Sequence, residues 1–364
     1  MLTFACQCGN ELHFSNTQCV QCELLLGLIP DEQRISAFTE THQREWLSVY
    51  NGKHYRPCKN YTQHQVCNWM IASDDTNEYC KSCRLTEVRP DIEKGDNLRR
   101  WFLLEQAKRR LLYSTIKFNL PINSKTENPE AGLGFAFLED IEEDNYGNEL
   151  TVKQYVVTGH NNGLITINIK EADHARRIDM REKMNESYRT LVGHFRHESG
   201  HYYWDRLINE TDKIDEFREL FGDERLNYEV ALDMYYKNGP IENWQNTWIS
   251  AYASMHPWED WAETWAHYFH MVDTLETANN FDVSISQTVI SNPYVHDEIQ
   301  TDYQIEESFT QLFNDWCRLT RVLNGLNRSM GLDDAYPFVI SISSLNKLRF
   351  VHQIINKFNN DLKS

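Results

Sequence analysis

The sequence predicts an α+β fold in which small zinc-ribbon modules precede a domain made of a small β-sheet and several helices. Eight of the nine cysteines form two quartets before residue 84, a pattern typical of zinc ribbons. Apolar residues alternate with strand periodicity between residues 132 and 169, and from residue 171 their spacing is mostly helical. These changes predict a zinc ribbon over 1–35, a second cysteine-rich zinc-binding module over 40–95 and one larger domain over 97–364.

Composition argues against two classes of partner. The chain carries 54 acidic and 36 basic residues, and its net charge of −18 argues against nucleic-acid binding and favours neutral or cationic substrates. Two short basic runs, Lys108-Arg109-Arg110 and Arg176-Arg177, are interpreted as solvated faces. No segment offers about 18 consecutive apolar residues, so we expect no membrane partner.

The cysteine quartets predict structural zinc. The first reads C-x-C…C-x-x-C, and the second also ends in C-x-x-C; they comprise Cys6, Cys8, Cys19 and Cys22, and Cys58, Cys67, Cys80 and Cys83. His54 or His64 could replace one thiolate of the second quartet. Disulfides are the alternative, but the first residues lack the pattern of a secretory signal. We therefore expect a cytoplasmic protein with reduced thiols and one or two structural zinc ions.

The elements of the larger domain follow from periodicity. A helix is expected over 97–117, because Trp101, Leu104, Ala107 and Leu111 recur on one face. A strand over 132–138 and an acidic turn over 140–148 come next. Strands over 151–158 and 163–169 are expected to pair through a hairpin turn. The remaining chain reads as helices, including one over 171–185 and a linker helix over 223–236.

The stretch from His197 to His201 has the H-E-x-x-H pattern. On a helix the two histidines lie one turn apart on one face and can bind one metal ion. Glu198 lies one step round the helix, where it can reach a metal-bound water without binding the metal. Such a site hydrolyses amide bonds; the alternative is a pair of core histidines. His194 shares the face and remains a reserve ligand.

A catalytic zinc site needs a third protein ligand. The extended metzincin motif is absent, because Trp204 and Leu207 stand where it requires glycine and histidine. The segment 256–270 offers two glutamates four residues apart near a helix start: we interpret Glu259 as the ligand and Glu263 as a residue that orients a histidine ligand. A solvated acidic face is the alternative, although the tryptophans of this segment argue against it. His267 and His270 are expected to pack rather than to bind metal.

These motifs resemble those of the gluzincin clan, which includes thermolysin and anthrax lethal factor. Lethal factor has a similar Glu-x-x-x-Glu helix and a tyrosine seven residues before the ligand glutamate, where Tyr252 stands here. Thermolysin differs at the positions of Trp258 and Glu263. The segments 189–205 and 256–270 also match the motifs of a bacterial family of zinc-binding metallopeptidases with an N-terminal zinc ribbon.

The resemblance implies a gluzincin-like domain with one catalytic zinc. Glu198 would be the general base, and Tyr252 the donor to the oxyanion, with His256 as a second candidate. The expected reaction is hydrolysis of a peptide or isopeptide bond in a protein or peptide substrate. The clan binds extended substrates along a sheet edge, for which residues 163–168 are expected, unless this strand is covered. The alternatives are a zinc-ribbon adaptor with an inactive peptidase-like domain and a non-peptide amidase.

Overall fold

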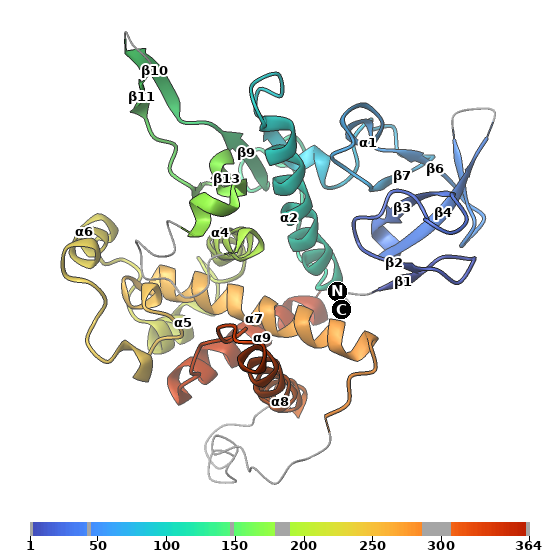
Figure 1. The fold of residues 1–364 in the computed structure, drawn as a ribbon. Helices are drawn as coiled ribbons and strands as arrows, with labels where there is room; N and C mark the ends of the chain where they lie inside the picture. Colours follow the sequence, from blue (N-terminus) through green and yellow to red (C-terminus); the bar gives the residue numbers. More distant parts are fainter. Residues whose placement is uncertain (1–2, 42–44, 146–148, 179–189, 286–306, 362–364) are drawn as a thin grey trace. The chain divides into compact units, whose positions relative to one another are not determined.

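The computed structural model describes residues 3–41, 45–145, 149–178, 190–285 and 307–361. Its backbone forms two compact units, one made of residues 2–182 and 190–198 and the other mainly of residues 199–364. The boundary falls inside one helix, α4 (Leu191–Leu207). Strands predominate in the first unit and helices in the second (Figure 1). The expected α+β class is confirmed.

The cysteine-rich region forms antiparallel β-structure. Strands β1 (Phe4–Ala5) and β2 (Glu11–Leu12) make a small hairpin. A five-stranded sheet follows, in the order β3 (Leu25–Ile29), β4 (Arg34–Glu40), β5 (Trp46–Ser48), β6 (His54–Pro57) and β7 (Met70–Ala72), with helix α1 (Lys59–His64) between the last two. Because β4 runs through residues 35–40, this sheet spans the boundary expected between the two cysteine-rich modules.

A second sheet and a long helix complete the first unit. The helix expected over 97–117 is confirmed as α2 (Asn97–Lys117), and the four residues of its predicted face are 0–3% exposed. The sheet has four strands in the order β12 (Gly159–Asn161), β13 (Leu164–Asn168), β9 (Gly134–Leu138) and β8 (Thr86–Val88). Strand β9 is parallel to both neighbours. Since β8 belongs to the cysteine-rich region, this sheet combines residues from both sides of position 97.

The predicted strand pairing after residue 140 is wrong. The expected acidic turn is largely strand: β10 (Ile141–Asn145) pairs with β11 (Glu149–Gln154) in a separate hairpin. The partner of β13 is instead the short β12, joined through Asn162 and Gly163, whose φ values of 45° and 79° suit a two-residue hairpin turn. Strand β13 therefore lies inside the sheet, and β12 forms the edge expected over 163–168.

The second unit is helical. Its helices are the C-terminal part of α4, α5 (Ile214–Phe221), α6 (Tyr228–Asn238), α7 (Pro257–Asn280), α8 (Glu307–Ser329) and α9 (Ile342–Asp361). Helix α7 is central, because its Trp261, Trp265 and Phe269 are completely buried. No helix among the described residues is long and apolar enough to cross a membrane.

Short 3₁₀ helices connect these elements. They are η1 (Pro30–Glu32), η2 (Cys83–Leu85), η3 (Ile169–Ala172), η4 (Trp244–Asn246) and η5 (Tyr252–Ser254). The helix expected over 171–185 overlaps η3 and lies partly outside the described residues. Two of these turns matter for the sites: η2 begins at a cysteine of the second quartet, and η5 begins at Tyr252.

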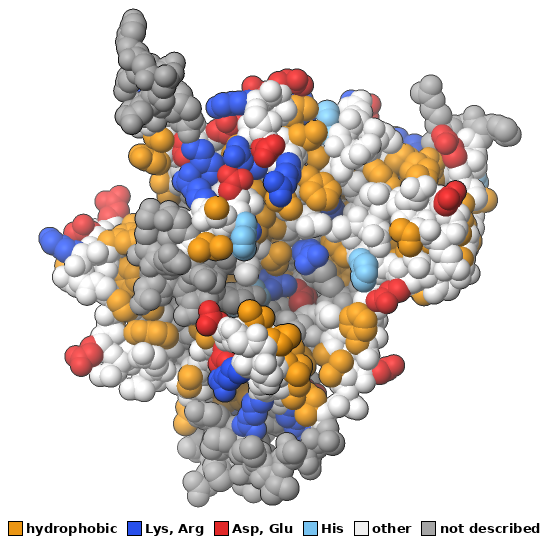
Figure 2. Space-filling model, viewed as in Figure 1, with side chains coloured by type: hydrophobic (Ala, Val, Ile, Leu, Met, Phe, Trp, Pro, Cys, Tyr) orange, Lys and Arg blue, Asp and Glu red, His pale blue; other side chains and the backbone are white. Residues whose placement is uncertain are grey.

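Basic and acidic side chains are intermixed on the surface of the first unit (Figure 2). Lys170 and Arg176 both lie near the buried carboxylate of Asp140, with nitrogen–oxygen distances of 3.2 and 3.6 Å. Arg100 pairs with Asp173 at 3.0 Å. These cations are therefore paired with carboxylates. Arg176 and Arg177 are half-buried, so the interpretation of this run as a solvated face is not confirmed.

Candidate metal centres

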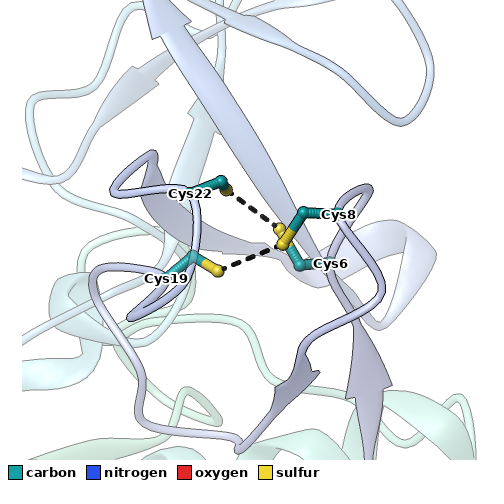
Figure 3. Close-up of side chains that lie close together, drawn as sticks. All are labelled: Cys6, Cys8, Cys19 and Cys22. Carbon is teal, nitrogen blue, oxygen red and sulfur yellow. Dashed lines mark hydrogen bonds between the residues drawn. The ribbon is translucent and has the colours of Figure 1, made fainter.

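The first cysteine quartet has the geometry of a metal site. The Sγ atoms of Cys6 and Cys22, and those of Cys8 and Cys19, are 3.6 Å apart (Figure 3). A disulfide needs about 2.05 Å, whereas zinc–sulfur bonds of about 2.3 Å in a tetrahedron place sulfurs about 3.8 Å apart. The backbone N–H of Cys22 lowers the pKa of the Cys19 thiol to about 6, which favours the thiolate that a metal binds.

The second quartet is more deeply buried. Its members lie close enough to share one ion, and they are 0–5% exposed: Cys58, Cys67, Cys80 and Cys83. The sulfurs of Cys67 and Cys80 are 3.7 Å apart. The alternative ligands are not needed, because His54 lies near Glu45 and His64 packs against Trp101. Both quartets therefore fit tetrahedral zinc through four sulfurs.

A third group combines the H-E-x-x-H helix with the later acidic helix. His197 and His201 lie one turn apart on α4, and Glu259 lies in the first turn of α7. Their ligand atoms all lie within 4.8 Å of one another, with His201 Nε2 3.5 Å from Glu259 Oε1. Metal–ligand bonds of about 2.1 Å in a tetrahedron require ligand spacings of about 3.4 Å. Two imidazoles and a carboxylate thus fit the donor set of a catalytic zinc.

The close approach of α4 and α7 explains one glycine of the motif. A Cβ atom at Gly200 would lie 2.9 Å from the Cα of Ala262, so a larger residue would push the helices apart. Two tryptophans of α7 hold α4 in this position. Trp261 donates to the carbonyl of Gly200 at 2.8 Å, and Trp265 donates to Ser199 Oγ at 3.2 Å. The residues between the two histidines therefore set the distance to Glu259.

Two tyrosines lie near Glu259, the glutamate of the candidate metal group. Tyr228, the first residue of α6, donates its hydroxyl to Glu259 Oε1 at 2.7 Å. Burial and the nearby charge of Glu259 raise the pKa of Tyr252 well above its usual value, so its hydroxyl stays protonated. The sequence identified Tyr252 but not Tyr228, because the predicted linker helix carries no motif that marks its tyrosine.

The other predicted residues have other partners. His256 caps α7: its Nδ1 accepts from Trp258 N–H, and its Nε2 lies 3.1 Å from the carbonyl of Leu226. Both ring nitrogens thus serve the backbone. Glu263 accepts from Ser250 Oγ at 2.6 Å, and its contact with a histidine ligand stays a prediction. Glu198 is 8% exposed and follows His197 on α4.

The remaining histidines lie outside the metal group. His194 Nδ1 is 3.3 Å from a carboxylate oxygen of Glu171, so the reserve ligand has a different partner. His267 Nδ1 lies 2.7 Å from the hydroxyl of Tyr336, and burial lowers the pKa of His267 to about 4. His270 is 7% exposed, with its ring 5.9 Å from that of His267. The expected packing role of these two residues agrees with this environment.

The fold and the three donor groups define a zinc-binding protein that joins a ribbon region to an α+β domain. Residues 97–354 match the family model described as "Putative zinc-binding metallo-peptidase", and residues 3–94 match a zinc-ribbon domain. The chain belongs to this metallo-peptidase family. It is 37% identical over 359 residues to uncharacterized proteins of Mycobacterium tuberculosis and Mycobacterium bovis, which covers 98% of this chain and 96% of each relative. No solved structure matches it significantly.

Proposed function

We propose that this protein is a gluzincin-type zinc peptidase that hydrolyses a peptide or isopeptide bond in a protein or peptide substrate. The observation that carries the proposal is the group of His197, His201 and Glu259, with Glu198 directly after His197 on α4. Membership in the metallo-peptidase family supports the same chemistry. The net charge of −18 and the locally paired cations favour a polypeptide over a nucleic acid.

The residues of the proposed site have different chemical roles. Zinc, held by the two histidines and Glu259, would supply a Lewis acid that makes a water molecule acidic. Glu198 accepts a proton from the attacking water while the water oxygen bonds to the substrate carbonyl carbon. Glu198 then delivers the proton to the leaving nitrogen as the carbon–nitrogen bond breaks.

The two tyrosines are assigned different roles. We propose that Tyr252, held protonated, donates to the oxygen that becomes negative during attack. Tyr228 holds the carboxylate of Glu259 through its 2.7 Å hydrogen bond and so orients the ligand. His256 is assigned to capping α7, since backbone groups occupy both of its ring nitrogens.

Substitution of the two tyrosines should affect different quantities, kcat in one case and zinc affinity in the other. Tyr252→Phe should reduce kcat about 10²-fold and retain zinc, because only the donor to the oxyanion is lost. Tyr228→Phe should weaken zinc binding about 10-fold, because the ligand carboxylate loses its orienting partner. Competition with a chelator measures zinc affinity, and cleavage of an internally quenched peptide library measures kcat. Tyr236→Phe, on α6 and 61% exposed, is the control. Equal zinc affinity in the parent and Tyr228→Phe would contradict the second role.

Metal stoichiometry tests the proposed centre directly. Elemental analysis of the parent should give about three zinc ions, two in the ribbon region and one at the His197 group. His201→Ala should reduce this to about two, because one ligand of the third site is removed. His174→Ala removes an exposed histidine and should leave the count unchanged. A parent that binds about two zinc ions, with no change in His201→Ala, would show that this group holds no zinc and would favour the adaptor alternative.

A further inference from the structure

Helix α2 carries charged side chains into the core of the first unit. Glu105, Lys108 and Arg109 are 0–2% exposed. A solvated face was predicted for the Lys108-Arg109-Arg110 run, and this prediction is wrong for the first two residues. Burying a charge is costly unless an opposite charge and hydrogen bonds compensate it. Arg109 therefore requires a negative charge near it in the core.

Two of these residues compensate each other. Lys108 Nζ lies 2.9 Å from Glu105 Oε2, and both side chains are completely buried. Thr86 donates its hydroxyl to Glu105 Oε1 at 2.7 Å, and Lys108 also binds Thr86. The ammonium group of Lys108 lies over the ring of Phe135 at 5.5 Å. The pair is therefore neutral and ties α2 to β8 and β9.

Arg109 also interacts with the charge of Glu105, but its guanidinium lies against the segment that carries Cys67. Its Nη1 donates to the carbonyl of Val66, the residue directly before Cys67. This hydrogen bond places the buried guanidinium beside the backbone that leads into Cys67.

A zinc ion bound by four thiolates carries a formal charge of about −2. This quartet is 0–5% exposed, so water cannot neutralise that charge. We propose that Arg109, on the peptidase helix α2, is the counter-ion of the zinc site formed by Cys58, Cys67, Cys80 and Cys83, and that metal loading at this site therefore stabilises α2 and its sheet. The ribbon is then a structural part of the peptidase core rather than a separable recruiting module.

Other contacts of α2 agree with this coupling. Gln33 donates to the carbonyl of Tyr113 at 2.9 Å, and Gln106 donates to Ser15 Oγ at 2.8 Å. The ring of Tyr113 packs edge-on against Phe14 at 5.7 Å. These contacts reach the first cysteine-rich region, whereas Arg109 on the same helix reaches the second. Loss of the second zinc, with protonation of the four thiolates, would remove the anion beside Arg109 and leave a buried cation in that interface.

The charge of Arg109 is tested on the full chain by chelator-induced thiol exposure. The parent, Arg109→Met and Arg99→Met are loaded with zinc, exposed to EDTA and alkylated with N-ethylmaleimide, and the modified cysteines are identified by peptide mass spectrometry. Arg99 lies on α2 but is exposed, so its substitution is the matched control. We expect Arg109→Met to speed alkylation of the second quartet about 10-fold, while the first quartet reacts as in the parent.

Two outcomes would overturn the proposal. One is an unchanged rate at the second quartet in Arg109→Met. The other is an equal acceleration at both quartets, which indicates general destabilisation. If Arg109→Met does not fold, Arg109→Lys replaces it: it retains the charge and should alkylate the second quartet within about 3-fold of the parent, and a rate 10-fold or more above the parent would contradict a counter-ion role.

The coupling has a separate test that needs no substitution. Hydrogen exchange of the zinc-loaded parent is compared with that of the parent after chelation, at the time when the second quartet becomes alkylated. The amides of α2 and β9 should lose protection together with this quartet. Retained protection in α2 after the second zinc has left would overturn the coupling. Neither test uses peptidase activity, so failure of the proposed function would not affect them.

Discussion

Glu198→Gln should abolish most turnover while leaving the zinc content at the parent value. The substitution keeps the size of the side chain but removes its basicity, so no group accepts the proton of the attacking water. General acid–base catalysis contributes about 10²- to 10⁴-fold, and we expect kcat to fall by at least the lower value. Cleavage of internally quenched peptides measures kcat, and elemental analysis measures zinc.

The control for this variant is Glu219→Gln. Glu219 is an exposed glutamate of α5 in the helical unit, so its loss should change neither turnover nor zinc. Retained turnover in Glu198→Gln would refute the proposed mechanism. Inhibition by peptide hydroxamates distinguishes a peptidase from a non-peptide amidase. Strong inhibition requires a cleft for an extended peptide, which a non-peptide amidase would lack.

Lys347→Met should lower the free energy of unfolding by about 3–5 kcal/mol. Lys347 of α9 is 2% exposed and lies 2.6 Å from Asp260 Oδ2 of α7, which is completely buried. Burial raises the pKa of Asp260 to about 7 even with the lysine present, so its ionised form depends on this partner. Removing the lysine leaves an uncompensated carboxyl beside Glu259. Denaturant unfolding at constant zinc concentration measures the effect.

Lys357→Met is the matched control for this prediction. Lys357 is also on α9, but its 2.8 Å pair with Asp212 is exposed, with side-chain exposures of 45% and 71%. Exposed pairs contribute about 0–1 kcal/mol, so we expect a small change. Equal effects of the two substitutions would show that the buried pair does not stabilise the junction of α7 and α9. Combining Lys347→Met with Asp260→Asn should restore part of the lost stability, because no buried charge remains.

Local pattern was sufficient for some elements and not for others. Helix α2 was predicted with its bounds, because a continuous apolar face depends only on the spacing of its own residues. Strand β9 was also recognised. The pairing of β10 with β11 was missed, because alternation identifies a strand without identifying its partner. The same limit led to the prediction that residues 163–168 form a sheet edge.

Local pattern likewise predicted some residues of the candidate site and missed others. His197, Glu198 and His201 follow from helical spacing, because residues four apart share a face whatever surrounds them. Glu259 was predicted partly through resemblance, and the structure brings it 3.5 Å from His201. Tyr228 was not predicted, because its contact with Glu259 joins residues 31 positions apart.

By itself, the sequence identified the two cysteine quartets, the histidine pair and helix α2, since each depends on residue type and local spacing. Only the tertiary structure decided which charges are buried. Lys108 and Arg109 look like a solvated basic run in the sequence, yet they lie in the core beside Glu105 and the second cysteine quartet. The cost of burying a charge is set by the groups that surround it, and these come from distant parts of the chain.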